Sequence, residues 1–290
     1  EIRVSQWKLQ QKNHIDYIPS NDFSFYDCVL DTMILFNIIP QCYKNLNLSQ
    51  LDTYFAMARG YQGENGDVKA LAMKKWFNTN YHYIVPEIDD STEIKLTGTK
   101  PFDMYNEAKT EGVVTKPVII GAFTLLKLSR FLGEKKAEDF VQSLTAAYSE
   151  LLNRLNDMGV EWVQFDEPYL VHDLSDNDLK LFGDLYNTIL KSKKNTKVLV
   201  QTYFGDIRDG YNQIINMDFD GIGIDFLEGK ESANLVNKYG FPKDKILFAG
   251  VINGKNIWRN NYEKTLSLLK MFQNRGYNFV ISTSCSLLHV

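Results

Sequence analysis

The feature that most constrains this sequence is a repeated order of short apolar run, turn and amphipathic helix. Apolar runs of strand length occur at Ile15–Ile18, His82–Val85, Val118–Gly121, Trp162–Phe165, Val198–Tyr203, Gly221–Phe226, Ile246–Val251 and Phe279–Thr283. Strands that alternate with helices form parallel βαβ units. Eight runs in one chain of 290 residues therefore predict an α/β fold, a TIM-type (β/α)8 barrel in a single domain over residues 1–290.

The segments between the strands support this fold. A helical period of apolar residues predicts helices over 137–158, 179–190 and 262–272. Asp178 and Asn261 are suitable N-cap residues for the second and third of them. An open doubly wound sheet is the alternative, but no glycine-rich phosphate-binding loop follows any strand, which weakens the nucleotide-binding version of that fold.

One stretch interrupts the alternation of predicted strands and helices. Residues 54–87 contain the polar, glycine-rich sequence GYQGENGD and then KKWFNTNYHY. This stretch is long for a simple connection between a strand and a helix. We expect it to be an insert that decorates one face of the barrel.

Composition limits the class of protein. The net charge of −4 gives no basic surface for nucleic acid. No apolar run reaches the roughly 18 residues of a membrane span. The three cysteines, Cys28, Cys42 and Cys285, are odd in number and far apart, so a reducing cytoplasm is expected. The polar start of the chain does not resemble a signal peptide and lacks an initiating Met, so we expect part of a longer protein.

In a barrel, functional groups gather where the strands end at their carboxyl termini. The polar residues at these ends are Asn21, Asp22, Glu87, Asp166, Glu167, Thr202, Tyr203, Asp225, Glu228, Asn253, Ser284 and Cys285. Zinc prefers Cys and His ligands. Cys285 is the only cysteine at a clear strand end, and no Cys-x-x-Cys pair exists. We therefore expect no metal site in this chain.

The adjacent carboxylates Asp166 and Glu167 allow two interpretations. Neighbouring residues on a strand point to opposite sides, so these two do not form a catalytic pair with each other. Glu167 paired with Asp225 or Glu87 is compatible with glycoside hydrolysis. The other interpretation, which residue chemistry favours, is that these acids accept hydrogen bonds and order the barrel mouth. Separately, a lysine beside the aromatic residues of 76–83 is suited to hold a carboxylate or phosphate.

Several stretches together resemble one family. They are WKLQQKNHIDYIPSNDFSFYDCVLDT (7–32), KWFNTNYHYIVPE (75–87), WVQFDEPYLV (162–171), AGVINGKNIWR (249–259) and STSCSLLHV (282–290). In this order they resemble the N-terminal half of cobalamin-independent methionine synthase. The resemblance implies a protein of two facing barrels that transfers a methyl group from 5-methyltetrahydropteroyl polyglutamate to homocysteine.

The resemblance also implies specific roles. Zinc is expected in the absent C-terminal barrel and not in this one, cobalamin is not used, and this fragment alone is expected to be inactive. Lys75 matches the family residue that binds the glutamate tail of the folate. Asp166 and Glu167 belong to a D-E-P element present in both halves, which favours a scaffold role at the barrel mouth.

The resemblance bears on the strand count as well. If the family's first strand lies before Glu1, this chain holds seven barrel strands and His82–Val85 belongs to a hairpin outside the barrel. The alternative function is a standalone, non-catalytic module that binds the folate tail or serves a structural role.

Overall fold

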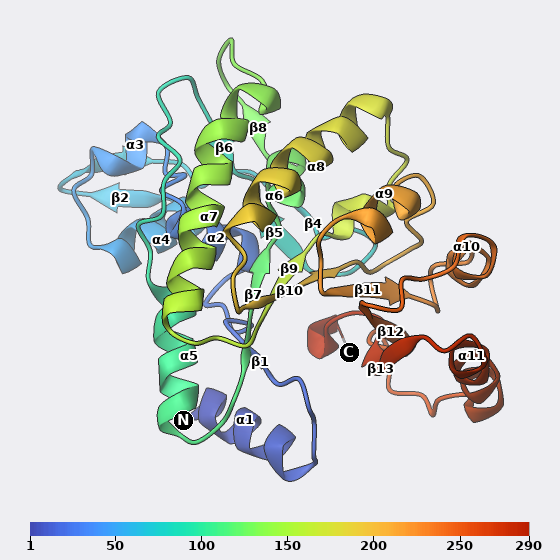
Figure 1. Ribbon diagram of the computed structural model, residues 1–290. Helices are drawn as coiled ribbons and strands as arrows, with labels where there is room; N and C mark the ends of the chain where they lie inside the picture. Colours follow the sequence, from blue (N-terminus) through green and yellow to red (C-terminus); the bar gives the residue numbers. More distant parts are fainter. Residues whose placement is uncertain (290) are drawn as a thin grey trace.

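A parallel sheet is the centre of the fold. The computed structural model describes residues 1–289. Seven parallel strands form one curled sheet in the order β1-β7-β9-β10-β11-β12-β13 (Figure 1). Their bounds are β1 Pro19–Ser20, β7 Lys116–Ile120, β9 Trp162–Asp166, β10 Lys197–Gln201, β11 Gly221–Asp225, β12 Ile246–Ile252 and β13 Asn278–Thr283. The predicted α/β fold is confirmed, and the sheet has seven strands, as the family resemblance implies.

The strand register brings the carboxyl ends of the strands to one side. Ile120 pairs with Asp166, and Asp166 pairs with Gln201. Farther along the sheet, Asp225 pairs with Gly250. The residues that end these strands therefore lie next to one another and form the mouth of the barrel. β1 and β13 are the two edges, and no strand ladder joins them among residues 1–289.

Helices cover the outer face of the sheet (Figure 1). Their bounds are α1 Ile2–Lys12, α2 Cys28–Leu35, α3 Gln41–Lys44, α4 Gln50–Arg59, α5 Lys100–Thr110, α6 Ala122–Leu128, α7 Val141–Asp157, α8 Asp176–Ile189, α9 Tyr211–Asn216, α10 Ser232–Tyr239 and α11 Tyr262–Asn274. The predicted helix over 137–158 corresponds to a short 3-10 turn followed by α7. Within the part of the chain that the structure describes, no helix has the length and apolar character needed to cross a membrane.

Two expectations about helix starts had different outcomes. Asn261 is the N-cap of α11, and its side chain accepts a hydrogen bond from the backbone N–H of Lys264 at 3.0 Å. The expectation for Asp178 was wrong. The N-cap of α8 is Ser175, and Asp178 lies three residues later, where its carboxylate accepts the N–H of Ser175 in a capping box.

Two of the eight apolar runs are not barrel strands. Ile15–Ile18 was predicted as the first strand, but β1 begins only at Pro19, after the apolar run. His82–Val85 contributes β5 (His82–Ile84), which pairs antiparallel with β4 (Met73–Lys75). Apolar character alone did not separate these segments from barrel strands, because a hairpin that packs on the barrel buries side chains too.

The remaining strands are short and lie outside the main sheet. β2 (Tyr61–Gly63) and β3 (Gly66–Val68) form a second hairpin. β6 (Glu87–Ile88) pairs in parallel with β8 (Arg130–Phe131). Both hairpins lie within the stretch 54–87, which interrupts the strand and helix order of the barrel.

Candidate functional site at the barrel mouth

The hairpin β4–β5 ends in a tight turn formed by Trp76 to Tyr81. The N–H of Trp76 donates to the carbonyl of Tyr81 at 2.8 Å, and the hydroxyl of Thr79 donates to the carbonyl of Trp76 at 2.6 Å. Phe77 has a φ of 49°, in the left-handed region that bulky residues rarely adopt. These two bonds are made within the turn and contribute to its shape.

Asn78, in this turn, is hydrogen-bonded to the loops that follow two barrel strands. Its amide nitrogen donates to Glu228, after β11, at 2.9 Å. Its amide oxygen accepts from the ammonium of Lys255, after β12, at 2.8 Å. Glu228 and Lys255 also form an ion pair with each other at 2.8 Å. The turn is thereby joined to the mouth of the barrel by a closed set of three polar contacts.

Aromatic side chains lie beside this polar contact. The ring of Phe77 stacks on His172 with centroids 5.4 Å apart and lies 5.7 Å from Phe204. Phe204 also lies 5.3 Å from His289, and the ammonium of Lys255 lies 4.9 Å above its ring. Phe77 of the turn therefore contacts the segments that follow β9 and β10, and Phe204 in turn contacts those that follow β12 and β13.

The structure brings together runs that are far apart in the sequence. Asn78 belongs to KWFNTNYHY, Lys255 to AGVINGKN, and His289 to the final run STSCSLLH. The ring of His289 lies 5.2 Å from that of Tyr81. Three of the stretches that carry the family resemblance thus meet at one place, the turn of β4–β5 on the barrel mouth.

Lys75 is the last residue of β4 and pairs with His82 of β5. Its side chain is exposed. Within residues 1–289, no carboxylate lies within ion-pair distance of its ammonium, and no side-chain hydrogen bond is made by it. The structure leaves this cation available to an external anion. Lys74 is exposed as well, but it pairs with Tyr83 and points to the opposite face of the hairpin.

The base of the same hairpin is fixed by Asp27, a residue that sequence reasoning missed. One carboxylate oxygen accepts the N–H groups of Val29 and Leu30 and caps α2, and the other accepts the N–H of Ile84 in β5 at 3.0 Å. Burial raises the pKa of Asp27 to about 7. An Asp before an apolar helix is an N-cap signal that was available in the sequence, but its bond to β5 was not.

Asp166 ends β9 and points into the barrel. It accepts the amide N–H of Gln164 at 2.7 Å and the hydroxyl of Tyr203 at 3.1 Å. Gln164 in turn accepts a hydrogen bond from the ammonium of Lys116. Burial raises the pKa of Asp166 to about 6, while its hydrogen bonds and the charge of Lys116 oppose that rise. Lys116, Gln164 and Asp166 thus form a hydrogen-bonded row inside the barrel, and Asp166 is the member nearest the mouth.

Glu167 has a different environment on the outer side of the same strand. Its side chain is fully buried and accepts the N–H groups of Phe123 at 2.9 Å and Thr124 at 2.7 Å, together with the hydroxyl of Tyr186. Phe123 and Thr124 lie in the first turn of α6, whose N–H groups need acceptors. Burial raises the pKa of Glu167 to about 7.

Gly121 packs directly against the side chain of Glu167. A Cβ atom added to Gly121 would lie 2.2 Å from the carboxylate, so only glycine fits beside it. A carboxylate with no exposed surface and three donors has no access to a sugar or a water nucleophile. This geometry argues against the glycoside hydrolase interpretation and supports a structural role for Glu167.

The other two acids considered as partners of Glu167, Asp225 and Glu87, also have partners within the protein. Asp225 accepts the N–H groups of Phe204 at 3.1 Å, Leu227 at 2.8 Å and Glu228 at 2.9 Å. Glu87 lies 3.6 Å from the guanidinium of Arg130. Asp225 therefore orders the loops that follow β10 and β11, whereas Glu87 of β6 faces Arg130 of the neighbouring β8.

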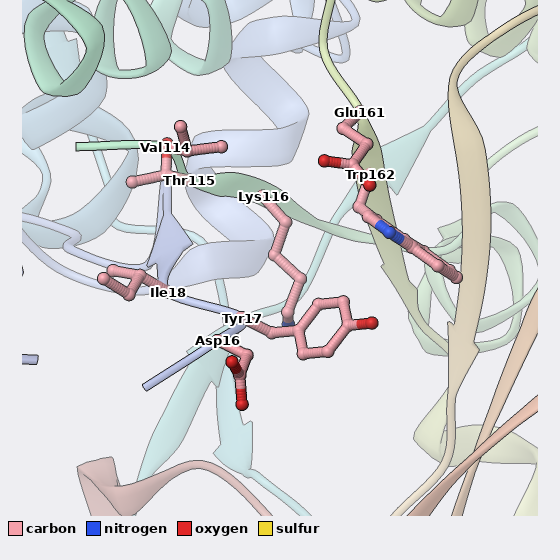
Figure 2. A pocket seen from close by; sticks show the side chains of 8 residues that line it. All are labelled: Asp16, Tyr17, Ile18, Val114, Thr115, Lys116, Glu161 and Trp162. Atoms are coloured by element: carbon pink, nitrogen blue, oxygen red, sulfur yellow. The ribbon is translucent and has the colours of Figure 1, made fainter. Parts of the chain in front are cut away.

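A cavity of about 170 Å³ lies at the opposite end of the barrel. Figure 2 shows its walls, with Lys116 from the start of β7 and Trp162 from the start of β9. The ring of Tyr17 meets the rings of Trp162 and Phe248 edge to face, with centroids 5.7 and 4.9 Å apart. Because it lies at the amino ends of the strands, this cavity is separate from the mouth where the hairpin is seated.

The side chains of this barrel are poorly suited to bind a metal ion. Within residues 1–289, no group of three or more His, Cys, Asp or Glu side chains is arranged to hold a metal ion. Cys285 is buried with its pKa raised to about 11, chiefly by burial, which disfavours the thiolate that zinc requires. The donor set of residues 1–289 therefore does not fit a zinc site.

Comparison with known proteins identifies the family. A family model described as the N-terminal domain of cobalamin-independent synthase matches residues 1–276. The chain belongs to this family. It is 57% identical over 290 residues to the 5-methyltetrahydropteroyltriglutamate–homocysteine methyltransferase of Campylobacter jejuni, and 56% identical to the protein of the same name from Lactococcus lactis subsp. cremoris. The alignments cover 100% of this chain and 38% of each relative, so the chain spans well under half the length of these relatives.

Solved structures agree on the fold of this synthase domain. A B12-independent methionine synthase from Shewanella sp. W3-18-1 is similar with a TM-score of 0.68 and 14% identity, over 99% of this chain and 82% of that one. A vitamin-B12-independent methionine synthase described as putative, from Listeria monocytogenes, is similar with a TM-score of 0.58 and 18% identity, over 69% and 66% of the two chains. At these identities the likeness shows the fold alone.

Proposed function

We propose that this chain is the N-terminal barrel, residues 1–290, of a two-barrel methionine synthase. The complete protein transfers a methyl group from 5-methyltetrahydropteroyl polyglutamate to homocysteine. The family match over residues 1–276 carries this proposal, and the name of the Campylobacter jejuni relative, at 57% identity, supports both substrates. In the reaction the homocysteine sulfur bonds to the methyl carbon, the bond from that carbon to N5 of the folate breaks, and N5 takes up a proton.

The part of this chain in that reaction is to bind the glutamate tail and to form one wall of the cleft between the barrels. The insert 54–87 carries the hairpin with Lys75. The exposed ammonium of Lys75, free of any carboxylate within residues 1–289, supports a contact with the tail. An ammonium on a flexible stem suits a polyanion that has no rigid shape. Asp166 and Glu167 act as scaffold beneath the mouth.

Zinc belongs to the other barrel in this proposal. There it would bind the homocysteine sulfur and keep it deprotonated. No step of the reaction is assigned to a metal held by residues 1–289, whose side chains are not arranged to bind one. We expect no methyl transfer from the 290-residue chain alone, because in this proposal the other barrel binds the homocysteine sulfur. The three free cysteines support a reducing, cytoplasmic location.

The experiment compares two neighbouring lysines in the full-length protein. We expect Lys75→Ala to weaken binding of 5-methyltetrahydropteroyl triglutamate about tenfold, because one charge-assisted contact is lost. Lys74→Ala is the matched control and should change the Kd far less. Binding of the triglutamate by the unmodified protein should also weaken at high ionic strength. Titration calorimetry at low and high salt measures both effects.

Two outcomes would overturn parts of this proposal. Equal effects of Lys74→Ala and Lys75→Ala on the Kd would remove the assignment of Lys75. Absence of methyl transfer to homocysteine by the full-length protein would remove the enzyme function. A natural polypeptide no longer than this chain would favour the second candidate, a standalone module that binds the tail without catalysis.

A further inference from the structure

We propose that Asn78 is a positioning residue for the glutamate tail, acting with Glu228 and Lys255 as a clasp that holds the Lys75 hairpin on the barrel mouth. This inference rests on the proposed function, because it assumes that Lys75 binds the tail. Asn78 lies three residues after Lys75, in the turn that joins β4 to β5. In this proposal the side chain of Asn78 contacts the barrel, and that of Lys75 contacts the ligand.

The hairpin needs such a contact because it is small. β4 and β5 have three residues each, and all three residues of β4 are exposed. A two-stranded hairpin of this size has little stability of its own in water. Its direction is therefore set by its attachments to the barrel. These are the buried side chains of Trp76, Tyr83 and Ile84, together with the polar contacts of Asp27 at the base and Asn78 in the turn.

The clasp uses both polar atoms of the Asn78 amide. The amide nitrogen donates to the Glu228 carboxylate and the amide oxygen accepts from the Lys255 ammonium. Only a side chain with both a donor and an acceptor makes both bonds. The Lys255–Glu228 ion pair closes the set and neutralises a carboxylate that would otherwise repel an anionic tail.

The backbone on both sides of the clasp is strained. Phe77 and Phe204 both have positive φ, 49° and 74°, and their rings lie 5.7 Å apart. Bulky residues hold such conformations only when the surrounding contacts impose them. Loss of the clasp is therefore expected to let the turn relax, and the relaxation moves Lys75 through the short turn that begins at Trp76.

The test is a double-mutant cycle on the full-length protein, with the Kd for 5-methyltetrahydropteroyl triglutamate as the readout. We expect Asn78→Ala to raise the Kd about fivefold. In the Lys75→Ala background the same substitution should add almost nothing, because there is no longer an ammonium to position. Additive effects of the two substitutions would overturn the inference, since they would mean that Asn78 acts independently of Lys75.

A charge-conserving exchange provides the second variant. Asn78→Asp alone places two carboxylates side by side and should weaken binding more than Asn78→Ala. Adding Glu228→Gln restores one carboxylate, one amide and the bond to Lys255, and should return the Kd to near that of the unmodified protein. Failure of this exchange to rescue binding would contradict the clasp, and it would do so even if Asn78→Ala folds poorly.

Different results would contradict the assignment of Lys75 to the tail and the role of the Asn78 clasp. If Lys75→Ala leaves the Kd unchanged, the tail assignment in the proposed function is wrong, and the clasp falls with it. If Lys75→Ala weakens binding but Asn78→Ala does not, the tail assignment stands and only the clasp is wrong. Thermal unfolding of each variant shows whether a changed Kd accompanies a change in fold.

Discussion

The carboxyl end of β9 and the turn of β4–β5 lie on the same side of the barrel but use polar residues in opposite ways. At the end of β9, Glu167 is fully buried and all its contacts are internal. In the hairpin, Lys75 is exposed and makes no ion pair within the described residues. A polar group whose hydrogen bonds are satisfied inside the protein stabilises the fold, whereas an exposed and unpaired charge is available for binding.

The largest expected effect is on the side of β9. Glu167→Ala removes the acceptor of three donors and leaves a buried cavity, so we expect the free energy of unfolding to fall by roughly 4 kcal/mol. Chemical denaturation measures this loss. Glu167→Gln is the matched variant, because it keeps the shape and some acceptor capacity and should lose less. A loss below about 1 kcal/mol for Glu167→Ala would break the contrast between the two regions.

A smaller effect concerns pH. The pKa of Glu167 is raised to about 7 from its ordinary value of 4.5, so between these values the folded protein binds more protons than the unfolded chain. The stability from this group is complete below about pH 4.5 and is lost as pH rises through about 7. Between about pH 6 and about pH 7 we expect a loss of about 1 kcal/mol in unfolding free energy.

The control for this pH dependence is Glu167→Gln, which does not titrate. Its unfolding free energy should fall less steeply with pH than that of the unmodified protein. A residual slope is expected, because the pKa of Asp27 is also raised to about 7 and that of Asp166 to about 6. Identical slopes in the two proteins would show that Glu167 does not titrate in this range.

The smallest expected effect on stability is in the hairpin. Lys75→Ala removes an exposed side chain without an internal partner, so the free energy of unfolding should change by less than about 0.5 kcal/mol. The same denaturation experiment measures it. A larger loss would mean that Lys75 contributes to the fold, and it would weaken its assignment as a binding residue.

Much of this fold could be predicted from single segments. Six of the eight apolar runs became strands of the sheet, because a buried parallel strand is apolar along its whole length. The start of α11 at Asn261 was likewise predicted from a local cap. The errors came where local rules gave more than one answer: Ser175 and Asp178 are both cap residues, and the apolar run 15–18 precedes the strand.

The candidate site was predicted only in part. Lys75 came from a resemblance over one continuous run, and the carboxylates of β9 came from their position at a strand end. The partners of Asn78 are 150 and 177 residues away in the chain. No periodicity or spacing connects residues at that separation, so the contact was not foreseen.

The sequence by itself determined the alternation of strands and helices and the family to which the chain belongs, because these depend on residue type and local order. Only the tertiary structure decided which polar residues are free. Glu167 and Lys75 are both charged residues near the barrel mouth, but one meets the N–H groups of α6 and a tyrosine and the other meets no partner among residues 1–289. That difference depends on contacts between distant segments, which exist only when the chain is folded.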